Sequence, residues 1–501
     1  MKTVIYSILL SIVFITFSCE DTFESLDVRN ENQPNIADLY TPEEFYALLK
    51  NGYNTWYNGA IAASPSIGFA NADLFACGTP GWGSGPMWFQ PRQPLFNDEH
   101  PDPVIVINFG AWYNFYSGIG TAVKLSQILN DPDYELVLNG IDYLPRAKAH
   151  VAIIQALLYG NIALLYDKAY LFTDEHEALT FDYVANTKSY KEVMDFAISK
   201  LDEAIALIEA DPVDVDYQSV IPGVNFNKTT LLQFANSMAA RFMVQNARTP
   251  AENEQTDWTK VEQYAANGLQ QDFNVLYDEG WRGKVMTRDE GANYLGLYNW
   301  GWIRANQWLI NKMAPEDTAA QYPWPEGVDR LGEITNYSDA RLNKYFRWDE
   351  FSDQWFGWSR VTRDGYGYFI RCEYRYWRYY DVIDAGDGYV GHYLKAENDL
   401  YLVEAKLKQG KGGAAELINN TRVTVGELPA ATDGDADLME KMFYERYVEC
   451  DLVWAHLGFF DKRRQGLLLP GTAYHFPIPA PELNRNGQAV YTFGGAPGTE
   501  M

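Results

Sequence analysis

Two groups of aromatic and polar residues have the chemistry needed to bind a hydroxylated ligand. A sugar ring has an apolar face of C–H groups, which a Trp can cover, and a rim of hydroxyls, which amide, carboxylate and guanidinium groups can bond. The first group consists of Asn71, Asp73, Trp82, Trp88 and Arg92. The second consists of Tyr298, Trp300, Trp302, Arg304 and Trp324. We predict that both groups contact ligand.

Patterns that would support catalysis are weak, and we predict no catalytic residue. Glu445 and Glu449 are four residues apart on a predicted helix. Their carboxyls therefore share one helix face, whereas a glycosidase needs two carboxyls that face each other across the sugar. We predict that both are buried beside Arg446 in a structural network. Ser84 does not stand in the G-x-S-x-G pattern of a nucleophile elbow, which argues against a serine hydrolase.

The chain shows no metal-binding pattern, and we predict neither a metal nor a cofactor. Asp433, Asp435 and Asp437 are spaced like the first ligands of a calcium loop. However, Leu438 replaces the glycine of the sixth position and Tyr444 replaces the glutamate of the twelfth. We therefore predict a solvated turn before a helix. The sequence contains neither C-x-x-C nor H-E-x-x-H.

The two aromatic groups fall in segments that interrupt an otherwise helical pattern, at 61–107 and 275–390. These insertions are rich in Gly, Pro and aromatic residues, and they hold 11 of the 15 Trp of the chain. Long irregular segments of a compact domain are usually functional, so we predict that the insertions form a binding face. For any single Trp, the alternative is that it packs an insertion onto the scaffold.

Apolar residues recur every three or four positions through most of the remaining chain, which predicts amphipathic helices. We predict a mostly α fold in which helix pairs separated by short connectors carry the insertions. The pattern resembles tetratricopeptide repeats, whose period is about 34 residues. The predicted helices are 45–57, 112–129, 144–165, 190–208, 229–247, 258–269, 392–408, 414–423 and 438–456.

The N-terminal segment is typical of a secreted protein that is held at a membrane. Lys2 precedes an apolar run from Val4 to Phe17, and Cys19 follows with an acidic segment behind it. In bacteria this pattern resembles a lipoprotein signal that is cut before the cysteine, so we predict residues 1–18 as signal peptide and Cys19 as the lipidation site. The alternatives are an ordinary signal peptide with a coincidental Cys, or a membrane anchor. Beyond residue 27 we expect no apolar run of membrane-spanning length.

The formal net charge of −27 excludes some classes of partner. Phosphate binding needs clustered Lys and Arg, so we predict no nucleic-acid partner. The same charge favours a neutral ligand over a polyanionic one. The alternative is a local basic patch made by Arg360, Arg363, Arg371, Arg375 and Arg378.

Five short motifs, in order along the chain, resemble those of the SusD/RagB family of nutrient-binding outer-membrane lipoproteins. They lie at 19–27, 398–405, 418–422, 445–464 and 476–484, and include Glu445-Arg446, Asp461-Lys-Arg463-Arg464 and Pro477-Ile-Pro479. His456-Leu457 stand where the family more often has Phe-Glu, which alters a helix end only. The resemblance covers nearly the full length.

The resemblance implies a SusD-like fold, with four tetratricopeptide-like helix pairs scaffolding an irregular face. Residues 19–38 would be the lipidated N-terminus and tether, and 39–501 one domain. The implied function is capture of an oligosaccharide or polysaccharide at the outside of the outer membrane, without catalysis. The implied partner is a SusC-like TonB-dependent transporter, which takes over the ligand. The alternatives are a RagB-type protein that captures peptides and, more weakly, a glycoside hydrolase.

Overall fold

The computed structural model describes residues 42–62, 75–77, 97, 103–138, 140–213, 217–277, 303–323, 331–348, 372–385, 388–450, 457–469 and 472–491. The chain divides into two units, Met1–Phe45 and Tyr46–Met501. The fold below is that of the second unit, into which helix α2 continues. The predicted signal peptide, Cys19 and the tether lie outside the described residues.

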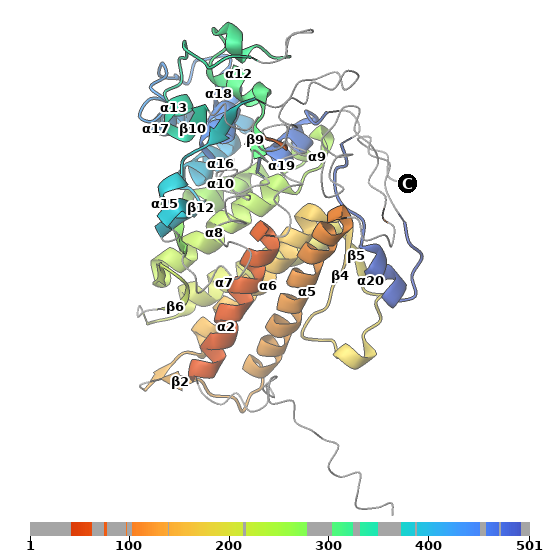
Figure 1. The fold of residues 1–501 in the computed structure, drawn as a ribbon. Coiled ribbons are helices and arrows are strands. Elements are labelled where there is room, and N and C mark those ends of the chain that lie inside the picture. Colours follow the sequence, from red (N-terminus) through yellow and green to blue (C-terminus); the bar gives the residue numbers. More distant parts are fainter. Residues whose placement is uncertain are drawn as a thin grey trace, which may run out of the picture. The chain divides into compact units, whose positions relative to one another are not determined.

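Helices dominate the described chain, as the periodicity predicted, and most pack on the next in chain order (Figure 1). Helices α5, α6, α7, α8 and α10 follow one another in this way, and α10 is followed by α16, α17 and α18. The bounds are α2 Pro42–Tyr57, α5 Pro103–Leu129, α6 Leu144–Leu165, α7 Tyr190–Ala210, α8 Lys228–Gln245, α9 Pro250–Glu254, α10 Trp258–Ala266, α16 Lys395–Lys408, α17 Ala414–Arg422, α18 Leu438–Glu445, α19 Leu457–Gln465 and α20 Ala480–Arg485.

Helix α6 is the centre of this core and corrects one expectation. By length and composition it could cross a membrane, with a mean hydropathy of 1.4 over its most apolar 18 residues, so the chain does contain such a run beyond residue 27. However, 94% of that window is buried inside the protein, and α5, α7 and α8 pack around the helix. A helix that is apolar all round and surrounded by others is a core helix of a globular fold.

Helix α7 shows how local sequence sets the scaffold. Val193, Ala197, Leu201, Ala204 and Ile208 are buried and lie on one face because they are three or four residues apart. The helix begins with a capping box, in which Ser189 and Glu192 satisfy each other's backbone N–H groups.

The strands form short two-stranded antiparallel sheets. They are β1 Phe75–Cys77 with β9 Ile303–Ala305, β2 Val137–Leu138 with β3 Ile141–Asp142, β4 Lys168–Tyr170 with β5 Thr187–Ser189, β6 Tyr217–Ile221 with β7 Val224–Phe226, β8 Phe273–Tyr277 with β12 Gly388–Tyr393, and β10 Phe346–Trp348 with β11 Tyr374–Tyr376. Of these, β1–β9 and β8–β12 join segments more than 100 residues apart. The remaining elements are the π-helices η2 Asn58–Ala62 and η7 Arg446–Cys450, the 3₁₀ helices η3 Ala178–Thr180 and η5 Thr318–Ala320, and α12 Gln307–Met313, α13 Arg341–Tyr345 and α15 Tyr380–Ala385.

Three predicted boundaries are wrong. Helix α5 begins at Pro103, inside the predicted first insertion, and α16 begins at Lys395 because His392 and Tyr393 belong to strand β12. The predicted last helix changes at Arg446 into the π-helical turn η7. Within the predicted second insertion, β9, α12, α13, β10, β11 and α15 are regular elements.

Candidate functional site

Strands β1 and β9 bring the two predicted insertions together. Phe75 pairs with Ala305, Ala76 with Arg304, and Cys77 with Ile303. The backbone N–H and the thiol of Cys372 both donate to the carbonyl of Ala305, at 3.4 Å and 3.1 Å. Segments more than 220 residues apart therefore meet at one junction, which is the arrangement a binding site shared by both insertions would need.

Of the predicted ligand-binding residues, Arg304 alone falls in a described element, as the middle residue of β9. The others lie outside the described residues and stay predictions. They are Asn71, Asp73, Trp82, Trp88, Arg92, Tyr298, Trp300, Trp302 and Trp324.

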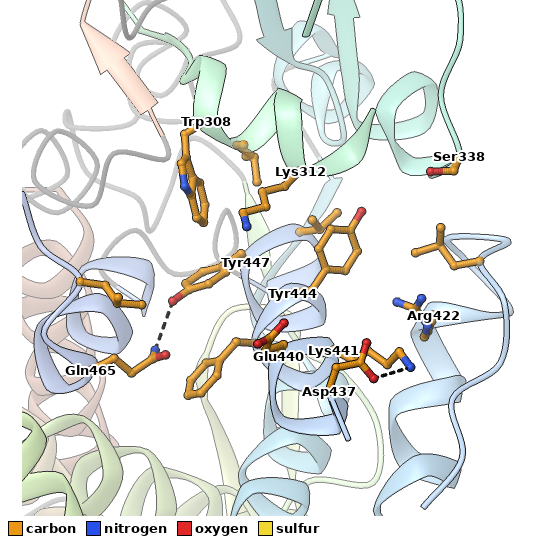
Figure 2. Close-up of a pocket in the computed structure, with 15 residues that line it drawn as sticks. Trp308, Lys312, Ser338, Arg422, Asp437, Glu440, Lys441, Tyr444, Tyr447 and Gln465 are labelled. Carbon is orange, nitrogen blue, oxygen red and sulfur yellow. Dashed lines mark hydrogen bonds and ion pairs between the residues drawn. The ribbon is translucent and has the colours of Figure 1, made fainter. Parts of the chain in front are cut away.

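Helix α12, which follows β9, leads into a pocket of about 530 Å³ (Figure 2). This volume is within the usual range of small-molecule sites, roughly 300–1,000 Å³. Figure 2 shows Trp308 and Lys312 entering from α12, while Glu440, Tyr444 and Tyr447 face them from α18 and η7. Helices α17 and α19 complete the walls with Arg422 and Gln465, respectively.

Trp308 is held firmly at the start of α12. The side chain of Asn306 caps this helix by accepting the backbone N–H of Trp308 at 2.8 Å. The indole packs edge-to-face with Tyr447, with 5.4 Å between ring centroids. The ammonium of Lys462 lies 3.8 Å from the centroid of the indole. The ring is only partly buried. It is therefore a fixed aromatic surface that a ligand can cover.

Two phenols beside Trp308 remain protonated at physiological pH. Burial raises the pKa of Tyr447 and of Tyr444 well above the ordinary value. Tyr444 donates its hydroxyl proton to Asp339. Tyr447 accepts a hydrogen bond from the amide of Gln465 at 3.2 Å, and its own proton is given to no described residue. Tyr447 can therefore donate to a ligand oxygen.

Three further polar groups on the wall have unused hydrogen-bonding capacity. The side chains of Lys312, Ser338 and Glu440 line the pocket and form no hydrogen bond or ion pair within the described part of the chain. Lys441, by contrast, is engaged by Asp435 at 2.5 Å and Asp437 at 2.8 Å. The pocket thus offers donors and an acceptor beside an aromatic surface, which is the combination that a hydroxylated ring requires.

Buried ion pairs fix the helices behind this wall, and they confirm the prediction that Glu445, Arg446 and Glu449 are structural. Arg341 donates to Glu445 at 2.6 Å and to Asp339 at 2.8 Å. Glu449 accepts from Tyr345 and Arg378, both at 2.9 Å. The predicted pairing of Glu449 with Arg446 is wrong, because Arg446 forms its ion pairs with Glu404 and Asp461.

A second cluster contains two arginines and two acids, all fully buried. Arg446 pairs with Asp461 at 3.0 Å and with Glu404 at 3.2 Å. Arg464 pairs with the same acids, at 2.7 Å and 2.5 Å. The cluster ties α16, η7 and α19 together. The buried acids and arginines of these motifs therefore hold the fold, and none of the four residues of this cluster lines the pocket.

The described lining of the pocket does not show the facing carboxyl pair of a glycosidase. Its acids, Asp437 and Glu440, lie three residues apart on the same helix, so they do not face each other. Carboxyls whose pKa burial raises do exist in the described chain, at Asp167, Asp399 and Glu445, but none of the three lines the pocket. Among the described residues, no cluster of His, Cys, Asp or Glu could hold a metal ion.

Sequence reasoning missed this pocket although part of its signal was present. Trp308 stands in the predicted second insertion, four residues after Arg304. Glu440, Tyr444 and Tyr447 follow one another at spacings of four and three, so they share a helix face. What the spacing could not show is that this face meets α12.

No protein-family model matches the chain, and no curated protein matches it either. Solved structures do match. A SusD superfamily protein from Parabacteroides distasonis is 13% identical with a TM-score of 0.60, covering 89% of this chain and 97% of that one. One from Bacteroides thetaiotaomicron is 11% identical with a TM-score of 0.55, covering 84% and 89%. A protein from Bacteroides fragilis described as SusD-like and carbohydrate-binding is 14% identical with a TM-score of 0.53, covering 85% and 87%.

These similarities span most of each chain and confirm the predicted fold. The TM-scores of 0.53 to 0.60 over 84–89% of this chain show that the neighbours share its fold. The protein has the fold of the SusD superfamily.

Proposed function

We propose that this protein is a non-catalytic glycan-binding lipoprotein of the outer membrane, which captures an oligosaccharide outside the cell and passes it to a TonB-dependent transporter. The observation that carries the glycan-binding part is the Trp308 pocket, with its fixed indole beside the unused polar groups of Lys312, Ser338, Glu440 and Tyr447. The fold supports the same conclusion, because one protein with this fold is described as carbohydrate-binding.

The energetics of the pocket fit a protein that must release its ligand. A Trp buries about 150–250 Å² when fully covered. If a sugar covers about half of it, one indole contributes about 2–3 kcal/mol. Association itself costs at least about 4 kcal/mol. One indole therefore cannot hold a ligand alone, and with several hydrogen bonds the affinity reaches roughly the millimolar to micromolar range.

Calorimetric titration with neutral glucose, mannose and xylose oligosaccharides tests the pocket. Replacing Trp308 with Ala is expected to weaken binding roughly 30- to 150-fold, the equivalent of about 2–3 kcal/mol. Glu440→Gln keeps the shape and removes an acceptor, so a loss of about threefold to tenfold is expected. Lys200→Ala, at a lysine of α7 that does not line the pocket, is the control. Unchanged affinity in both pocket variants would refute this site.

The residues predicted from the sequence, with Trp82 and Trp302 first among them, are proposed to extend the site from the insertions that meet at β1 and β9. A peptide pool in the same titration tests the RagB-type alternative. Binding of peptides without binding of any glycan would establish that alternative. Shortened glycan products after incubation would instead reveal a hydrolase.

The second part of the proposal is delivery of the glycan, which requires a partner transporter. A capture protein without a pore needs a transporter beside it, so the gene next to this one is expected to encode a TonB-dependent transporter. Cells that lack that transporter should still bind the glycan through this protein but should not import it.

A further inference from the structure

A second hollow, of about 360 Å³, lies between the β6–β7 hairpin and the β8–β12 sheet. It is separate from the Trp308 pocket, with which it shares no lining residue. Most of its polar lining consists of neutral side chains, and Asp272 is its single charged member.

The β8–β12 sheet has one buried and one open face. Phe273 and Val275 point inward, where the ring of Phe273 stacks on Phe234 with 4.7 Å between centroids. The alternate residue Asn274 is exposed, and so is Tyr389 on the partner strand. Because side chains alternate along a strand, Asn274 and Tyr389 share the open face as diagonal neighbours. The residue directly opposite Asn274 is Gly391, which leaves the space between them free of a side chain.

The turn of the β6–β7 hairpin holds Tyr389 in place. Gly223 follows Pro222 and has a φ of +74°, as the third residue of a type II turn requires. The carbonyl of Pro222 accepts the backbone N–H of Leu276 at 2.9 Å, which pins the turn to β8. A Cβ on Gly223 would lie 2.5 Å from Cε1 of Tyr389. The glycine therefore lets the turn touch the ring, while Tyr389 stays 55% exposed.

Four carboxamide side chains line the hollow together with this ring, and their hydrogen-bonding capacity is unused in the described chain. Asn225, Gln233, Gln271 and Asn274 line the hollow, and none of their side chains bonds another residue in the described chain. Each carboxamide offers two donors and an acceptor. Asp272 is engaged, because it accepts the backbone N–H of Lys395 at 2.9 Å.

We propose that this hollow is a second carbohydrate-binding site, which stacks a sugar on Tyr389 and bonds its hydroxyls through the four carboxamides. A supported aromatic ring with neutral donors and acceptors around it matches a neutral sugar and gives a carboxylated one no cation to pair with. The proposal rests on the proposed function for the class of ligand, but it does not need the Trp308 pocket. Two separate contacts would let the protein hold one glycan that spans both sites more tightly than either site alone.

Hydrogen–deuterium exchange tests the site locally. With maltohexaose, cellohexaose or laminarihexaose at millimolar concentration, peptides covering 221–226, 271–277 and 388–393 should exchange more slowly in the wild-type protein. In Tyr389→Ala, the ligand concentration needed for the same protection should rise about tenfold or more. Protection near Trp308 should stay unchanged. Tyr113→Ala, at another exposed tyrosine, is the matched control. Oligogalacturonate should protect none of these peptides.

The outcomes separate this proposal from the first. Protection near Trp308 without protection of the three peptides would overturn the second site and leave the proposed function standing. Protection of the three peptides that survives in Trp308→Ala supports the second site. No protection anywhere with any neutral glycan would overturn both. Equal protection by oligogalacturonate would overturn the neutral class of ligand. Asn274→Ala, at an exposed position, gives a second variant should Tyr389→Ala unfold.

Discussion

Charged side chains do two different jobs in this protein, and burial separates them. Glu404, Arg446, Asp461 and Arg464 are fully buried and form ion pairs with one another. Asn253, Gln245 and the carbonyl of Leu400 complete their hydrogen bonds. Removing one member of such a cluster leaves a buried charge uncompensated, which typically costs about 3–5 kcal/mol. Lys312 and Glu440 instead stand at the solvent-exposed wall of the pocket, where a charge can meet a ligand.

Asp167 gives the fold a specific pH dependence. Burial raises its pKa to about 6, although Tyr491 donates to its carboxylate at 2.9 Å. Since the folded state favours the protonated carboxyl, this group's contribution to stability is complete below about pH 4 and is lost as the pH rises through 6. The loss amounts to about 3 kcal/mol.

Asp167→Asn is expected to remove that loss, because an amide oxygen can still accept the bond from Tyr491. Urea denaturation at pH 4, 5, 6 and 7 measures it. The stability of the variant relative to the wild-type protein should rise by about 2 kcal/mol between pH 4 and pH 7. Asp133→Asn, on an exposed loop, should track the wild type. A gap between Asp167→Asn and wild type that is the same at every pH would contradict the assignment.

Close helix packing depends on particular glycines. Gly160 of α6 lies against Phe242 of α8, and a Cβ added there would come within 2.3 Å of the buried ring. Gly120 of α5 has nothing within 4 Å of the same position. The two glycines are alike in secondary structure and differ in surroundings.

Alanine at these two positions should therefore change stability in opposite directions. Gly160→Ala is expected to cost about 1–3 kcal/mol from overpacking. Gly120→Ala should gain about 0.5–1 kcal/mol, because Ala loses less backbone entropy in a helix. Denaturation midpoints measure both changes. If Gly160→Ala proves as stable as Gly120→Ala, α6 and α8 are not packed as closely as described.

Local periodicity predicted helices well and contacts between distant segments poorly. Helix α6 begins and ends where its apolar pattern does. The start of α16 was misplaced because Tyr393 pairs with Phe273 in a strand 120 residues away. Asp433 looked like part of a solvated turn, yet it caps α17 by accepting the backbone N–H of Gly413, Ala414 and Ala415.

The same limit applies to the sites. Tyr444 and Tyr447 could be assigned to one helix face, but no sequence pattern indicates that Trp308 packs against that face. Tyr389 was equally hidden, since its role depends on a glycine turn 166 residues earlier in the chain. The aromatic residues that were predicted from the sequence to bind ligand all lie outside the described residues. Of the two predicted groups, only Arg304 lies in a described element.

The whole molecule carries a net charge of −27, so it is not drawn to an anionic membrane surface by charge. A protein of this charge that works at a membrane needs another means of attachment. Acyl chains supply one, because each buried CH₂ contributes about 0.8 kcal/mol and several chains make the attachment effectively permanent. Cys19, directly behind the apolar segment, is the proposed attachment point. Cys372 and Cys450 are buried in the fold and cannot serve.

Cys19→Ala is therefore expected to move the protein from the membrane fraction to the soluble fraction and to abolish incorporation of labelled palmitate. Cys372→Ala should keep both properties, because its thiol is buried in the interior, where it donates to the carbonyl of Ala305. Cell fractionation with immunoblotting, and palmitate labelling of the same cells, measure the two effects. Were the Cys19→Ala protein to remain in the membrane fraction without palmitate, the apolar segment itself would be the anchor. The captured glycan would then be held beside the transporter by a peptide segment and not by lipid.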